Sequence, residues 1–200
     1  MKRQAYMRVM ILLAAALGQG QALAADLGIP RGSYGLDKTH AYISFGYSHL
    51  GFSTPQVGFN DFDVQLQLDA ADPSKSEFAV TIEAASVDSR VAKFDEHLRG
   101  ADYFDVATFP QITFVSTSIQ MLDEKTATVQ GDLTIKGVTK PTNLKLTLNK
   151  AGNHPILRKP TLGVSAVGTI SRSQWGLSNY APAVSDEVTL TVSVEMPKLN

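Results

Sequence analysis

Residues 188–196 read Val-Thr-Leu-Thr-Val-Ser-Val-Glu-Met, and apolar and polar side chains alternate at every position. Successive side chains of a β-strand point to opposite faces, so this segment predicts a strand with one apolar and one polar face. Such a strand is typical of an antiparallel sheet that is buried on one side and hydrated on the other.

The same alternation recurs along most of the chain, in the segments 41–47, 63–69, 78–84, 112–120, 127–135, 143–149 and 163–171. Turn residues such as Asp72-Pro73-Ser74 separate several of these segments. No helix-length segments alternate with the strands, which argues against βαβ units. The sequence therefore predicts an all-β fold of eight antiparallel strands. Closure into a barrel would remove the sheet edges, whereas two sheets packed face to face would protect them less completely.

One stretch departs from the strand pattern. Within residues 86–99, the side chains of Val87, Val91, Phe94 and Leu98 recur at helical spacing, and Gly100 suits the end of a helix. We therefore expect a short amphipathic helix after the third of the eight strands.

Four aromatic residues follow this helix within twelve positions: Tyr103, Phe104, Phe109 and Phe114. They either fill the end of an ordinary β core or line the mouth of a cavity. An eight-stranded barrel is just wide enough to be filled by side chains or to hold one small ligand. Residue pattern alone leaves both interpretations open.

The N-terminal 24 residues have the features of a secretory signal peptide. A basic start precedes a short apolar run over residues 9–17, and Ala22-Leu23-Ala24 is a suitable cleavage sequence. The apolar run is shorter than the roughly 20 residues that span a bilayer. We expect cleavage after Ala24, export to the periplasm, a linker over residues 25–33 and a single domain over residues 34–200.

Composition restricts the classes of partner. Loss of the signal would leave 15 basic and 19 acidic residues, a formal charge of −4. This acidic balance argues against nucleic acid and against a stable grip on anionic lipid headgroups, so any membrane contact should be transient. The chain has no cysteine, which excludes disulfides and thiol chemistry.

Several blocks in a fixed order carry a resemblance to a known family: residues 34–40 (Tyr-Gly-Leu-Asp-Lys-Thr-His), 57–62, 98–116, 131–141 (Gly-Asp-Leu-Thr-Ile-Lys-Gly-Val-Thr-Lys-Pro), 171–176 (Ser-Arg-Ser-Gln-Trp-Gly) and 185–188. In these blocks the chain, from Tyr34 to Met196, resembles the YceI-like proteins, exported lipocalin-like bacterial proteins described as binding polyisoprenoids. Ala41 is a departure, because the family usually has serine there. The resemblance implies an eight-stranded antiparallel lipocalin-like barrel with an apolar tunnel for an isoprenoid chain, such as a prenyl quinone tail. It also makes a homodimer plausible.

The resemblance favours the cavity interpretation of the aromatic residues. Together with the alternation it predicts these ligand-binding residues: Phe45, Tyr47, His49, Phe62, Phe94, Leu98, Phe104, Phe109, Phe114 and Trp175. His49 would meet the polar head of the lipid. Arg172 and Trp175 should also fasten one end of the barrel, in part through backbone hydrogen bonds.

Motifs for chemistry are weak in this sequence. Residues 163–167 lack the second glycine of a nucleophile elbow, and the histidines at 40, 49, 97 and 154 have no metal-ligand spacing. We therefore predict a binding protein that needs no cofactor, metal or catalytic residue and that carries or stores an isoprenoid. Two alternatives stay open, an enzyme acting on the head group of a bound lipid and a ligand-free stress protein with a packed core.

Overall fold

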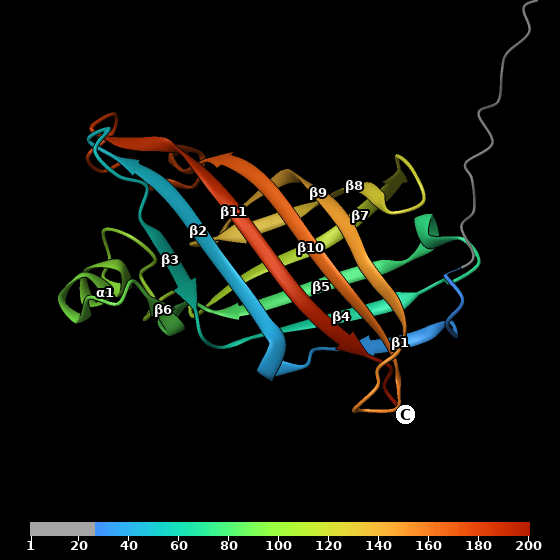
Figure 1. The fold of residues 1–200 in the computed structure, drawn as a ribbon. Coiled ribbons are helices and arrows are strands. Elements are labelled where there is room, and N and C mark those ends of the chain that lie inside the picture. The colour runs from blue at the N-terminus through green and yellow to red at the C-terminus, as the bar shows by residue number, and fades with distance from the viewer. Residues whose placement is uncertain (1–26) are drawn as a thin grey trace, which may run out of the picture.

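The structure is a computed structural model that describes residues 27–200 (Figure 1). The predicted signal peptide lies outside these residues. The described part contains eleven strands: β1 Gly32–Gly35, β2 Ala41–His49, β3 Gln56–Phe59, β4 Phe62–Leu68, β5 Glu77–Glu83, β6 Val87–Asp88, β7 Gln111–Met121, β8 Thr126–Ile135, β9 Val138–Asn153, β10 Pro160–Ser171 and β11 Val184–Pro197. Its helices are α1 Ala92–Arg99 and the short 3-10 turns η1 Lys38–His40, η2 Pro73–Lys75, η3 Ala84–Ser86 and η4 Arg172–Trp175.

All strands belong to one antiparallel sheet with the order β1-β4-β5-β7-β8-β9-β10-β11-β2-β3-β6. The sheet curls into a half-barrel, with α1 beside the short strands β3 and β6 (Figure 1). At the end opposite α1, the amide of Leu199 donates to the carbonyl of Ser33 at 2.9 Å. This contact brings the C-terminal residues against β1, so the two ends of the described chain meet there.

The alternation read from the sequence is confirmed by burial. In β4, Phe62, Val64, Leu66 and Leu68 are buried, whereas the three side chains between them are exposed. The inner faces of the strands thus share one apolar core, as expected for an antiparallel sheet with one wet face.

The number of strands was predicted wrongly, although the all-β class is confirmed. The eight predicted strands correspond to β2, β4, β5 and β7 to β11. The three additional strands, β1, β3 and β6, have four, four and two residues. Strands this short show too few alternating positions to be recognised.

The helix also begins later than predicted. Val87 and Asp88 form β6 and pair with Phe59 and Gly58 of β3, so α1 begins only at Ala92. It ends at Arg99, and Gly100 is its C-cap as expected. Within residues 27–200, no helix combines the length and apolar character needed to cross a membrane.

Candidate binding site

A cavity of about 760 Å³ lies inside the curled sheet, next to α1. Its volume is within the range of ~300–1,000 Å³ that is usual for small-molecule sites. Its deep wall is built from inward-facing aliphatic side chains of seven strands: Ile43, Val80, Ile82, Ile112, Leu133, Ile135, Leu144, Ile170, Val188, Leu190 and Val192. A wall of this composition suits an apolar ligand.

The cavity opens between three loops. Leu50 follows β2, Val91 precedes α1 and Tyr180 precedes β11, and each of these side chains lines the cavity while being more than half exposed. We call these three residues the mouth. The amide of Leu50 donates to the carbonyl of Ala183 at 2.8 Å, which ties two of the loops together.

A group of aromatic rings narrows the cavity behind the mouth. The ring centroids of Phe45, Phe59 and Phe104 lie 5.7 to 6.1 Å apart, in tilted and edge-to-face arrangements. Phe45 also stacks on Tyr47, two residues further along the same face of β2, at 6.4 Å. Such pairs stabilise each other beyond their burial, so this aromatic group is a firm wall.

Polar side chains also reach the cavity near the mouth. His49 continues the inward face of β2, and the imidazole of His97 packs edge-on against Tyr103 at 4.8 Å. Burial raises the pKa of Tyr47 and of Tyr103, so both phenols are protonated at neutral pH and can donate hydrogen bonds.

Hydrogen bonds fix α1 against the barrel. The carboxylate of Asp95 accepts from the amide and the hydroxyl of Ser89, at 2.7 and 2.5 Å. At the other end of the helix, the guanidinium of Arg99 donates to the carbonyls of Ala85 and Val87, both at 2.8 Å. The helix therefore presents Phe94, His97 and Leu98 to the cavity from a fixed position.

Arg172 holds the loop that carries Tyr180. Its buried guanidinium donates to the carbonyls of Asn179, Val184 and Ser185 at 2.9 to 3.0 Å, and also to that of Leu177. The prediction that Arg172 fastens one end of the barrel through backbone hydrogen bonds is confirmed. Since the side chain also lines the cavity, it links the mouth loop to the interior.

Seven of the ten residues predicted to bind ligand line this cavity: Phe45, Tyr47, His49, Phe94, Leu98, Phe104 and Phe114. The structure thus brings them together, and their contact with a ligand stays a prediction.

The sequence-based prediction also placed Phe62, Phe109 and Trp175 at the cavity. In the structure none of these three residues lines it. Phe62 packs in the core at the start of β4. Phe109 lies over Gly137, where an added Cβ would come within 2.6 Å of its ring. Trp175 is buried in η4, and its indole N–H donates to the carbonyl of Leu133 at 3.2 Å. All three side chains fill structural positions.

Several wall residues were absent from the sequence-based list, notably Leu50, Phe59, His97 and Tyr180. Phe59 belongs to a strand too short to show alternation. Leu50 and Tyr180 have left-handed backbone conformations, with φ of 54° and 63°. Residues other than glycine seldom adopt such angles, and no sequence pattern signals them here.

Comparisons with known proteins agree with this geometry. Residues 34–196 match the YceI-like domain. A UPF0312 protein of Pseudomonas putida (strain W619) is 38% identical over 183 residues, which cover 90% of this chain and 91% of the relative. The crystal structure of Burkholderia cenocepacia BcnA matches with a TM-score of 0.73 and 26% identity, covering 80% of this chain and 98% of BcnA.

A polyisoprenoid binding domain from Saccharophagus degradans matches with a TM-score of 0.63 and covers 85% of this chain and all of that domain. Its identity is only 15%, so this likeness concerns the fold alone. The family match and the identity to the Pseudomonas relative confirm the resemblance seen in the sequence: the chain belongs to the YceI-like family.

Proposed function

We propose that the protein binds an extended isoprenoid lipid in its cavity and acts as a carrier or reservoir. The observation that carries this proposal is the open cavity of about 760 Å³ with its aliphatic and aromatic wall. The family and the fold shared with a polyisoprenoid binding domain support a lipid-binding role. A ligand-free packed core is disfavoured, because the interior of a protein that holds no ligand is normally filled by side chains and leaves no large cavity.

The energetics suit a carrier. Each five-carbon isoprene unit that leaves water contributes up to ~4 kcal/mol. A bilayer buries the same tail equally well, so transfer from membrane to protein changes the free energy little. A tail taken from one membrane can therefore be returned to another.

The head group of the lipid would lie at the mouth. Tyr47, His49, His97 and Tyr103 supply polar atoms on that side, whereas the deep wall is aliphatic. A quinone or alcohol head can accept hydrogen bonds from the protonated phenols while the tail extends inward. Because burial raises the phenol pKa values, these tyrosines act as donors and not as bases. This favours binding over an enzymatic reaction at the head group.

We place this exchange in the periplasm, on the basis of the signal-like sequence of residues 1–24. The lipid would enter during brief contact between the mouth and a bilayer. Leu50, Phe52 and Tyr180 are 55%, 90% and 64% exposed and can enter the headgroup region. The acidic net charge keeps this contact short. Formation of a homodimer stays a prediction.

The direct test is to purify the mature protein without detergent, extract it with organic solvent and identify the extract by mass spectrometry. A stoichiometric isoprenoid is expected. If the extract is empty and the protein also fails to bind added prenyl quinone, the proposed function is wrong.

Membrane contact beside the mouth is tested by Phe52→Ser, because Phe52 lies in the loop between β2 and β3, two residues after Leu50. Transfer of a prenyl quinone from vesicles to the protein should slow about tenfold, because the most exposed aromatic ring no longer enters the bilayer. Affinity for the quinone measured without vesicles should stay unchanged, since Phe52 does not line the cavity. Stopped-flow fluorescence with quenching of a vesicle probe measures the rate.

Ile156→Ser is the matched control. Ile156 is 82% exposed and lies in the loop between β9 and β10. This loop is at the end of the barrel opposite α1 (Figure 1). Its replacement should leave the transfer rate unchanged. Equal rates for the Phe52 variant and the unmodified protein would show that the loop between β2 and β3 does not contact the membrane.

A further inference from the structure

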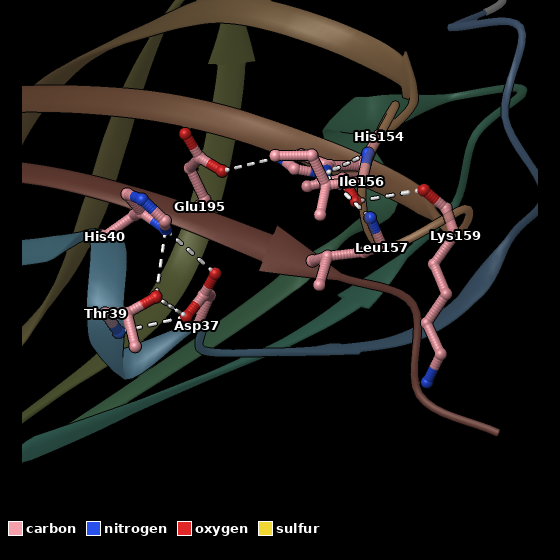
Figure 2. Close-up of polar contacts among 9 residues, drawn as sticks. Asp37, Thr39, His40, His154, Ile156, Leu157, Lys159 and Glu195 are labelled. Atoms are coloured by element: carbon pink, nitrogen blue, oxygen red, sulfur yellow. Dashed lines mark hydrogen bonds and ion pairs between the residues drawn. The ribbon is translucent and has the colours of Figure 1, made fainter.

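A second group of ligand-type side chains lies outside the cavity, at the beginning of β2 and the end of β11. Asp37, His40 and Glu195 each offer one donor atom, and these three atoms all lie within 4.8 Å of one another (Figure 2). They converge because β2 pairs with β11, with Ala41 opposite Val194, and because the amide of Asp37 donates to the carbonyl of Glu195 at 2.9 Å.

The spacing of the first two donors fits a metal ion. Nδ1 of His40 lies 3.1 Å from Oδ2 of Asp37, and the two share a proton in a hydrogen bond, which Zn²⁺ would displace on binding. A tetrahedral Zn²⁺ with bonds of about 2.1 Å holds neighbouring ligand atoms about 3.4 Å apart. These two side chains therefore need little adjustment, and rotation of the flexible Glu195 side chain would bring in the third donor.

Charge and hydrogen bonding also fit a cation. The carboxylate of Asp37 accepts hydrogen bonds from the amide and the hydroxyl of Thr39, at 2.9 and 2.7 Å, which hold it in place. Among the described residues, Oε2 of Glu195 is buried and makes no hydrogen bond, and its neighbour is Nε2 of His154 at 3.5 Å. The ammonium of Lys38, next to Asp37 in sequence, is paired with Asp61 at 3.0 Å.

His154 has a supporting position. Its Nδ1 accepts from the amides of Ile156 and Leu157 at 3.3 and 3.1 Å, which assigns the ring proton to Nε2 (Figure 2). Nε2 faces Oε2 of Glu195 at 3.5 Å. With the lone pair of Nδ1 taken by the two backbone amides and its proton on Nε2, His154 orients the carboxylate from behind, as outer partners of metal ligands do.

We propose that Asp37, His40 and Glu195 form a binding site for one Zn²⁺ ion, with water in the fourth position. One imidazole nitrogen and two carboxylate oxygens are ligands that Zn²⁺ accepts, and the two carboxylates balance its charge. The His40 side chain is 60% exposed, which leaves the site accessible to an ion. Bound there, the ion ties the start of β2 to the end of β11.

The test is titration of EDTA-treated protein with ZnCl₂ in a non-chelating buffer by isothermal calorimetry, with MgCl₂ in parallel. One Zn²⁺ per chain is expected, and no binding of Mg²⁺, which prefers six oxygen ligands. His40→Ala and the isosteric Glu195→Gln should each weaken Zn²⁺ binding by about tenfold or more. His97→Ala, at the cavity, should leave it unchanged.

Absence of binding up to millimolar ZnCl₂, or equal affinity in His40→Ala, Glu195→Gln and the unmodified protein, overturns this proposal. Since the site lies outside the cavity, Glu195→Gln should bind prenyl quinone normally. That measurement also shows that the variant is folded, so the zinc proposal and the lipid proposal can fail separately.

Discussion

The substitution Val192→Trp is expected to lower the affinity for a prenyl quinone by about 100-fold or more. Val192 faces the cavity from β11. An indole at this position would occupy space that about one isoprene unit needs, and that unit contributes up to ~4 kcal/mol. Because the cavity can take up the larger side chain, we expect the fold to persist. Fluorescence titration with the quinone measures the affinity, and urea unfolding reports the stability.

The matched control is Val167→Trp. Val167 lies on the neighbouring strand β10, opposite Thr191, and is half exposed on the outer face of the sheet. The Val167→Trp variant carries the same new side chain outside the cavity, so its affinity for the quinone should equal that of the unmodified protein. If Val192→Trp bound the quinone as tightly as Val167→Trp, the isoprenoid chain would not lie in this cavity.

Arg172→Met is expected to lower the free energy of unfolding by about 3 kcal/mol. Methionine fills part of the same volume but donates no hydrogen bonds. Four carbonyls therefore lose their donor, those of Leu177 and Asn179 in the loop before β11 and those of Val184 and Ser185 at the start of β11. Hydrogen exchange at the amides of residues 177–185 should also become faster. Urea denaturation followed by circular dichroism gives the stability.

Arg158→Met serves as the comparison, because Arg158 is exposed between β9 and β10. The free energy of unfolding of the Arg158→Met variant should differ from that of the unmodified protein by less than about 0.5 kcal/mol. Arg172→Lys should have an intermediate effect, since one ammonium cannot reach all four carbonyls. Equal stability of Arg172→Met and Arg158→Met would mean that the mouth loop is held by other contacts.

The sequence predicted the long strands well and the short ones poorly, for a physical reason. Long strands with one wet face, such as β4 and β11, repeat the same alternation often enough to be identified. The two residues of β6 become a strand only because β3 pairs with them. Pairing of this kind depends on the tertiary arrangement, which local pattern does not contain.

For the binding site too, prediction from the sequence succeeded in a long strand and failed outside the strands. Alternation along β2 correctly placed Phe45, Tyr47 and His49 at the cavity. It gave no guidance for Phe109 and Trp175, which lie outside the strands, where side chains have no fixed two-residue period. Their packing against Gly137 and the Leu133 carbonyl follows from long-range contacts.

The pairing of β2 with β11 has a consequence for the order of folding. Strands β7 to β11 follow one another as hairpins, each paired with its neighbour in sequence. The contact of Ala41 with Val194 instead joins nearly the two ends of the domain, and closing so large a loop costs entropy before any contact forms. We therefore expect the hairpins to form first and β2 to join them late. The cavity then forms only with this last step, so a nascent chain that still lacks β11 has no cavity to hold a ligand.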